Sequence, residues 1–153
     1  MAVSLEQIKK LREITGAPII ECRQALEESN NDEKKALEYL KKKGLDKAEK
    51  KSSRETKNGW IACYTHTTGK VGVLVEILCE TDFVARNEEF QNLGHELCLQ
   101  VASMKPKDVQ ELLRQEYVRE SSKKVEELIK EVIFKTGENI VVNRFQRFQL
   151  GEK

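Results

Sequence analysis

At 153 residues, the chain is long enough for one medium-sized domain or two small ones. Charged residues make up 35% of it, and their signs nearly cancel to a formal charge of +1, which argues against a general nucleic-acid binder because such proteins are usually strongly basic. No apolar run approaches the roughly 20 residues that a membrane span needs, and the first residues lack the basic and then apolar pattern of a secretory signal. We therefore expect a cytoplasmic protein that has no membrane partner.

Three short helices are predicted within residues 1–45. Ser4 and Gln7 have the spacing of a capping box at the start of the first helix. Gly16 suits a left-handed helix end, and the third helix is predicted to end at Gly44. A bundle of this size has few core residues and is marginally stable alone, which is typical of a docking module.

The stretch 46–58 is predicted to be a basic connector. Its cations outnumber its anions: Lys47, Lys50, Lys51, Arg54 and Lys57 stand against Asp46, Glu49 and Glu55. No aromatic residue is interleaved among them to stack on bases. The pattern therefore favours a solvated, partly helical linker over an RNA contact, and nucleic acid is not an expected partner.

Residues 59–153 are expected to form an α+β core domain. Strand patterns at 60–66 and 71–79 flank a short turn at 67–70, which predicts a hairpin. Helices are predicted at 87–104, 108–117 and 122–135, and a third strand at 136–152 with a bulge between Val142 and Phe145. The whole chain is thus predicted to be α+β: an N-terminal three-helix bundle, then a small three-stranded antiparallel sheet packed with helices.

Asp82 and Phe83 stand side by side at the bend between the strand ending at Cys79 and the helix expected after Asn87. A loop that holds an apolar ring beside a carboxylate has the chemistry of a tip that inserts into a partner. The alternative from the residues alone is that Phe83 folds back into the core of its own domain and that Asp82 caps the helix.

Four cysteines show no metal-binding or redox spacing. Cys22, Cys63, Cys79 and Cys98 form no CxxC pair and have no zinc-like spacing to His66 or His95. We expect buried, reduced thiols that pack as small apolar side chains. The sequence contains no pattern typical of a nucleophilic catalytic set and no phosphate-binding glycine loop. We therefore expect neither an enzyme nor a cofactor or metal site, and no direct nucleotide binding.

Three sequence blocks, in order along the chain, resemble the bacterial elongation factor Ts family, the nucleotide-exchange factors of the translational GTPase elongation factor Tu. The blocks are Leu-Arg-Glu-Ile-Thr-Gly-Ala at 11–17, Glu-Thr-Asp-Phe-Val-Ala-Arg-Asn at 80–87 and Gly-Glu-Asn-Ile-Val-Val-Asn-Arg-Phe-Gln-Arg-Phe at 137–148. The resemblance covers 4–104 and 125–152. The stretch between them is much shorter than in most of the family, where it builds a second subdomain that reaches the distal domain of elongation factor Tu. A short form can compensate as a homodimer, or it can rely on the bundle and the tip alone.

The resemblance implies a ubiquitin-associated-like fold for the N-terminal bundle, which docks on the G domain of elongation factor Tu. Where the family usually carries an arginine and two methionines that touch the GTPase, this chain has Arg12, Ile19 and Ile20. Isoleucine keeps the apolar area but lacks the adaptability of methionine, so we expect a contact tuned to its own partner. The alternative is that both isoleucines lie in the core of the bundle.

The resemblance also implies that the tip, formed by Thr81, Asp82, Phe83 and Val84, enters beside the nucleotide site of the GTPase and disturbs its Mg²⁺ ion. The predicted function is guanine-nucleotide exchange on elongation factor Tu. The alternative is a ubiquitin-associated-like binding adaptor without exchange activity, and RNA binding through the connector is a third class.

Overall fold

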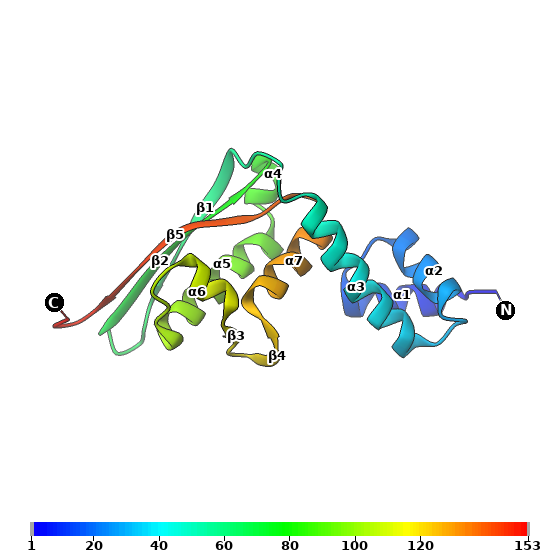
Figure 1. Cartoon of the computed structure of the whole chain (residues 1–153), viewed down its shortest axis with the longest axis horizontal. Coiled ribbons are helices and arrows are strands. Elements are labelled where there is room, and N and C mark those ends of the chain that lie inside the picture. Colours follow the sequence, from blue (N-terminus) through cyan, green and yellow to red (C-terminus); the bar gives the residue numbers. More distant parts are fainter. Residues whose placement is uncertain (1, 153) are drawn as a thin grey trace.

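The computed structural model describes residues 2–152 and has a mixed α+β architecture. The elements follow in the order α1 (Leu5–Thr15), α2 (Ile19–Glu28), α3 (Glu33–Lys50), β1 (Asn58–Thr65), β2 (Val71–Cys79), α4 (Asp82–Ala85), α5 (Glu88–Met104), α6 (Val109–Arg114), β3 (Glu116–Tyr117), β4 (Glu120–Lys124), α7 (Val125–Thr136) and β5 (Val141–Gln149). Three N-terminal helices form one end of the molecule, and β1, β2 and β5 form a sheet with helices on one side (Figure 1). The predicted fold class is confirmed.

The N-terminal bundle begins as predicted. The Ser4 side chain accepts a hydrogen bond from the Gln7 backbone N–H, and the Gln7 side chain accepts one from the Ser4 N–H, which completes the capping box. Gly16 ends α1 in the left-handed region at φ 68°. The small core of the bundle consists of Ile8, Leu11, Ala17, Cys22, Ala25, Leu26, Ala36 and Leu40.

The third helix is longer than predicted. It does not end at Gly44 but continues to Lys50, so the first residues of the expected connector are helical. Gly44 is buried where α3 crosses α7, and a Cβ atom there would lie 3.0 Å from a ring carbon of Phe134. The glycine therefore permits close helix packing rather than ending the helix. The division into 1–45, 46–58 and 59–153 stays a prediction.

The sheet has the strand order β1-β2-β5, and both pairs are antiparallel. The hairpin between β1 and β2 and the third strand are confirmed. Arg144 pairs with Glu76 while Val142 pairs with Ile77, so Asn143 is an extra residue in β5. The predicted bulge between Val142 and Phe145 is therefore confirmed.

One face of the sheet packs on α5. Phe90, Leu93, Leu97 and Val101 recur along that helix and are all buried, as the spacing predicts. Met104 continues the same spacing, but it lies at the end of α5 and is exposed. Because the helices cover only one face, several apolar side chains on the other remain in contact with solvent, including Ile61, Leu74, Val141 and Phe148.

The segment 105–124 differs most from the prediction. The helix expected at 108–117 is only six residues long, and the helix expected from 122 begins at Val125. Between them, the short strands β3 and β4 form a hairpin. The buried Gln100 side chain of α5 fixes it, donating to the Glu116 carbonyl at 3.0 Å and accepting from the Val118 N–H at 3.0 Å. These polar strands are stabilised by a distant side chain, which local periodicity does not reveal.

The cysteine prediction is correct for three of the four thiols. Cys22, Cys79 and Cys98 are buried, and burial raises the pKa of the Cys98 thiol to about 12. Cys63 is exposed, because it lies on the solvent face of β1 next to the buried Ala62. Within 2–152, no group of three or more histidine, cysteine or acidic side chains could hold a metal ion. Within the same range, no helix has both the length and the apolar character needed to cross a membrane.

Candidate functional site

The tip between the sheet and α5 is one turn of helix rather than an open bend. Thr81 is the N-cap of α4, and its hydroxyl oxygen accepts a hydrogen bond from the Val84 N–H at 3.3 Å. Asn87 then caps α5 by accepting a hydrogen bond from the Glu89 N–H at 2.8 Å. The chain therefore turns from β2 into α5 through two consecutive capped helix starts.

Phe83 points away from the protein. Its side chain is 89% exposed, the largest exposed fraction among the exposed large apolar residues in the described part of the chain. The alternative expectation, that this ring packs into its own core, is therefore wrong. The ring is therefore available to a partner, and its burial there would be favourable.

Val84 behaves in the opposite way. Only 8% of it is exposed, and it lies with Ala85 in the main core cluster. The expectation that Val84 contacts a partner is therefore not supported by its position. Its side chain anchors the turn to the sheet domain, and this anchoring leaves the preceding ring outside.

Asp82 stays on the surface beside Phe83. Its carboxylate forms an ion pair with Arg86 at 2.8 Å, and both side chains are well exposed. Exposed pairs of this kind contribute little to stability. The carboxylate can therefore exchange Arg86 for a group on a partner at small cost.

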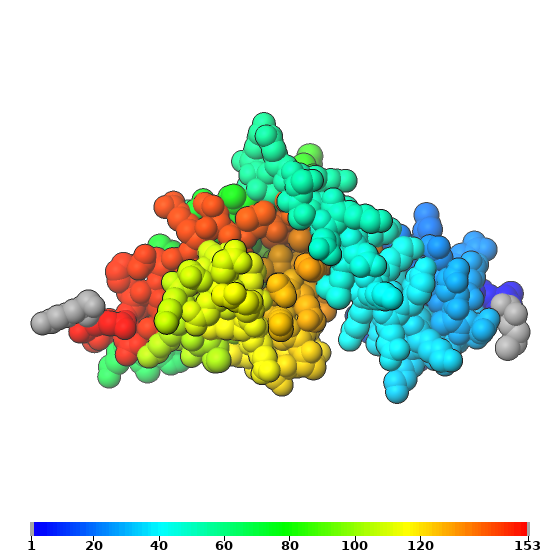
Figure 2. All heavy atoms as spheres, viewed as in Figure 1, coloured from blue at the N-terminus to red at the C-terminus, as the bar shows by residue number. Residues whose placement is uncertain are grey.

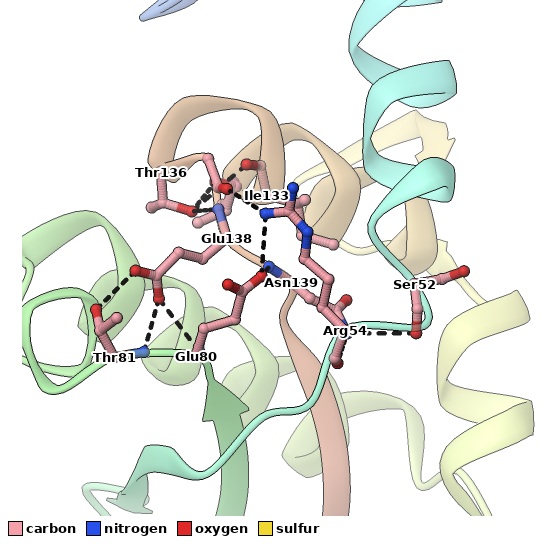
Figure 3. A network of polar contacts seen from close by, with 10 residues as sticks. Ser52, Arg54, Glu80, Thr81, Ile133, Thr136, Glu138 and Asn139 are labelled. Atoms are coloured by element: carbon pink, nitrogen blue, oxygen red, sulfur yellow. Dashed lines mark hydrogen bonds and ion pairs between the residues drawn. The ribbon is translucent and has the colours of Figure 1, made fainter.

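A network of polar contacts fixes the start of the tip (Figure 3). The Glu138 carboxylate, from the turn between α7 and β5, accepts hydrogen bonds from the backbone N–H groups of Glu80 (3.1 Å) and Thr81 (2.9 Å). Its second oxygen accepts from the Thr81 hydroxyl at 2.6 Å. In return, the Glu80 carboxylate accepts from the Asn139 N–H at 2.8 Å.

The same network reaches the segment that follows α3. The Asn139 side chain is buried and donates to the Arg54 carbonyl at 2.9 Å and, more weakly, to the Ser52 carbonyl at 3.4 Å. Sequence reasoning missed Glu80, Glu138 and Asn139 as parts of the site. The available signal was the polar pair Glu138-Asn139 between an apolar helix and an apolar strand, inside one of the family-like blocks.

The N-terminal bundle presents a second surface. Ile19 is 52% exposed and Ile20 78% exposed, so the alternative that both lie in the core is wrong. Arg12 is also exposed, on the last turn of α1, while the two isoleucines begin α2. Only 16–18 separate these helices, so the three side chains lie at the same end of the bundle.

The isoleucine pair is backed by an ionic cluster. Glu21 follows Ile20 and is nearly buried; its carboxylate forms ion pairs with Lys43 (2.7 Å) and Lys47 on α3. Burial alone would raise the pKa of Glu21, but hydrogen bonds from the two lysines outweigh it and lower the pKa below its ordinary value. The same contact raises the pKa of Lys43. These pairs hold the start of α2 against α3.

Where the N-terminal bundle meets the sheet domain, the contact is close-packed on one side and forms a groove on the other. A Cβ atom on Gly16 would approach the Lys135 side chain to 2.9 Å, and Phe134 packs against the bundle core. Beside them, a groove of about 230 Å³ lies between α3 and the segment formed by β4 and α7 (Figure 2). The bundle is thus held in one orientation by direct contacts with α7.

The structure thus presents two exposed apolar surfaces, Phe83 at the tip and Ile19 with Ile20 at the bundle, on one α+β scaffold, and surfaces of this kind are typical of protein-binding proteins. Comparison with known proteins gives the family. Residues 80–153 match the model of a family described as elongation factor TS. The chain is 44% identical over 196 aligned positions to elongation factor Ts of Thermotoga neapolitana, with all of both chains covered.

Two more distant relatives agree. Elongation factor Ts of Leptospira biflexa is 42% identical, with 99% of both chains covered. That of Rippkaea orientalis is 40% identical, with 98% of this chain and 79% of the relative covered. The chain belongs to the elongation factor Ts family, a family of translation elongation factors. The aligned 196 positions exceed the 153 residues of this chain, so part of each relative has no counterpart here.

Proposed function

We propose that this protein is a guanine-nucleotide exchange factor for elongation factor Tu and that the Asp82-Phe83 tip promotes GDP release. The observation that carries the proposal is the 89% exposed ring of Phe83 on a turn that is capped and anchored. Membership of the elongation factor Ts family supports the choice of partner. Such a factor makes and breaks no covalent bond, so it is not an enzyme in the usual sense, and it requires no cofactor.

The mechanism follows from linkage. Suppose that the protein binds the nucleotide-free GTPase more tightly than it binds the GDP-bound form. By linkage, it must then weaken the affinity of the GTPase for GDP by the same ratio. Mg²⁺ demands near-ideal octahedral geometry and bridges protein to phosphate. A ring inserted beside that ion therefore needs to displace it only slightly to weaken GDP.

The energy for insertion comes from the tip itself. Transfer of the Phe83 ring from water into an apolar pocket provides about 1.5–3 kcal/mol. Asp82 loses only a weak, exposed ion pair when it turns to a partner group. The turn is already formed in the free protein, so little ordering entropy opposes binding.

We further propose that the bundle end formed by Arg12, Ile19 and Ile20 docks on the G domain of elongation factor Tu. The two isoleucines supply an apolar contact, and Arg12 supplies a donor for an acidic or carbonyl group. Because α3 continues as one helix from the bundle to its contact with α7, the separation of the two binding surfaces is set by packed helices.

We propose a homodimer through the solvent face of the sheet. Ile61, Leu74, Val141 and Phe148 are exposed there, and the central Glu76 pairs with Arg144 at 2.6 Å. A second copy would bury this apolar surface and replace part of what the longer relatives carry in their additional segment. Sedimentation equilibrium of the protein and of Leu74→Lys tests this: a dimer that becomes monomeric supports it, and a wild-type monomer overturns it.

The exchange proposal is tested by the release of fluorescent GDP from the cognate elongation factor Tu at increasing concentrations of this protein. Faster release supports it, and release at the spontaneous rate overturns it. A protein that binds the GTPase equally well with and without GDP, and leaves release unchanged, would instead be an adaptor. Met104→Ala serves as a control because it removes an exposed apolar side chain at the other end of α5 from the tip.

A further inference from the structure

The residue that holds the tip in place comes from a distant part of the chain. Glu138 lies in the turn after α7, yet its carboxylate takes three hydrogen bonds from Glu80 and Thr81, the two residues before α4. The contact at 2.6 Å between the Thr81 hydroxyl and the Glu138 carboxylate is the shortest of the three, as expected for a hydroxyl that donates to a charged oxygen.

This contact sets the direction in which the Thr81 hydroxyl acts. A hydroxyl has one proton and two lone pairs. Because its proton points to Glu138, a lone pair is left for the Val84 N–H, whose nitrogen lies 3.3 Å away. The carboxylate thus holds Thr81 in the state that caps the helix carrying Phe83.

The tip needs this support because α4 is only four residues long. A single helical turn is unstable alone, since nucleation fixes several dihedral angles for one hydrogen bond. The burial of Val84 and Ala85 anchors its inner side, and the cap fixes its first residues. The Asp82 and Phe83 side chains have no comparable anchor, so their direction depends on the cap.

The hydrogen bonds between residues 80–81 and 138–139, here called the brace, run in both directions. Glu138 receives backbone N–H groups from Glu80 and Thr81, while Glu80 receives the backbone N–H of Asn139 at 2.8 Å. The carboxylate of each segment therefore accepts backbone hydrogen bonds from the other segment, although the two are nearly sixty residues apart. Rotation of the peptide before α4 would break contacts in both directions.

We propose that Glu138 is a positioning residue for nucleotide exchange, which acts through Thr81 to hold the Asp82-Phe83 tip in the orientation that enters the partner. This role rests on the exchange function proposed above. Glu138 itself is only partly exposed and does not need to touch the GTPase.

The brace is tested first in the free protein by amide hydrogen exchange. In Glu138→Gln, one oxygen can still accept the backbone N–H groups, but the amide nitrogen cannot accept the Thr81 hydroxyl. We expect the Val84 amide to exchange about tenfold faster, while amides in the centre of α5 keep their protection. Equal protection of Val84 in the variant and the wild type would overturn the brace. Thr81→Val, which keeps the shape and removes the hydroxyl, should reproduce the effect, and Thr81→Ser should restore protection.

The role in exchange is tested by a double-mutant cycle in the GDP-release assay. We expect Glu138→Gln to lower the maximal release rate three- to tenfold with little change in the half-saturating concentration. In a Phe83→Ala background the same substitution should have a much smaller effect, because the ring is already gone and only Asp82 remains to be positioned. Independent losses that multiply in the double variant would overturn the positioning role and indicate a general structural effect.

Controls separate the two proposals. Glu55→Gln makes the same change in charge at a highly exposed carboxylate near the network and should leave release and Val84 protection unchanged. If Phe83→Ala does not slow GDP release, the exchange mechanism and the role of Glu138 in it both fail. In that case the amide-exchange result still decides whether the brace holds the turn.

Discussion

The two exposed surfaces of this protein are built in opposite ways. At the tip, one ring stands almost fully in solvent, and polar contacts from a distant turn hold the backbone beneath it. At the bundle end, two partly exposed isoleucines extend from a small apolar core and are backed by ion pairs between helices. The tip is suited to a step that requires exact orientation, and the bundle to a contact that supplies affinity. Substitutions at the tip should therefore lower the maximal rate of GDP release, and substitutions at the bundle end should raise the half-saturating concentration.

The largest effect is expected at the tip. Phe83→Ala should lower the maximal rate of GDP release about 10- to 150-fold, which corresponds to the loss of about 1.5–3 kcal/mol of burial in the complex. The thermal stability of the free protein should hardly change, because the ring is 89% exposed. The measurement is fluorescent-GDP release at saturating concentrations, beside a melting curve. An unchanged maximal rate would contradict the assignment of GDP release to the tip and of affinity to the bundle.

The bundle should show the complementary behaviour. Replacing both Ile19 and Ile20 by alanine should weaken complex formation about tenfold, since each is already half or more exposed and contributes part of its area to a partner. The maximal release rate should stay near that of the wild type. Calorimetry measures the affinity, and a titration of the release assay measures the half-saturating concentration. Equal affinity for the variant and the wild type would show that this end of the bundle does not bind.

The connection between the surfaces can be tested at Gly44. A Cβ atom there would lie 3.0 Å from the Phe134 ring, so Gly44→Val should push α3 away from α7. Overpacking of this kind typically destabilises by about 1–3 kcal/mol. We expect a lower melting temperature and a raised half-saturating concentration, because the bundle loses its fixed orientation. Gly44→Ala should have a milder effect. Alanine has a better helix propensity than glycine, which offsets about 1 kcal/mol of the strain.

The sequence predicted those features that depend on local patterns. The capping box, the hairpin, the buried face of α5 and the bulge in β5 all follow from spacing within a few residues. It also predicted the tip, although the residues alone left the direction of Phe83 open. Gly44 was misinterpreted because a glycine that ends a helix and one that permits helix packing look the same in sequence. The β3–β4 hairpin and the role of Glu138 could not be predicted because both depend on side chains far away in the chain.

The smallest effect is expected for the ionic cluster of the bundle. Glu21→Gln should lower the free energy of unfolding by about 1 kcal/mol near pH 7, a modest value because Lys47 is partly solvated.

The pH dependence follows from the lowered pKa of Glu21. A carboxyl with a lowered folded-state pKa contributes stability above its ordinary value of 4.5 and loses it as the pH falls through the folded value. Because the pKa of Lys43 is raised, the stability that its charge contributes is fully present at neutral pH. It is lost only as the pH rises above the ordinary value of 10.5. The difference between Glu21→Gln and the wild type should therefore be constant between pH 6 and 8 and shrink below about pH 4.5. Urea unfolding at several pH values measures it. A difference that persists at low pH would mean that the charge of Glu21 is not the source of its stabilising effect. GDP release at saturating concentrations should be unaffected in either case.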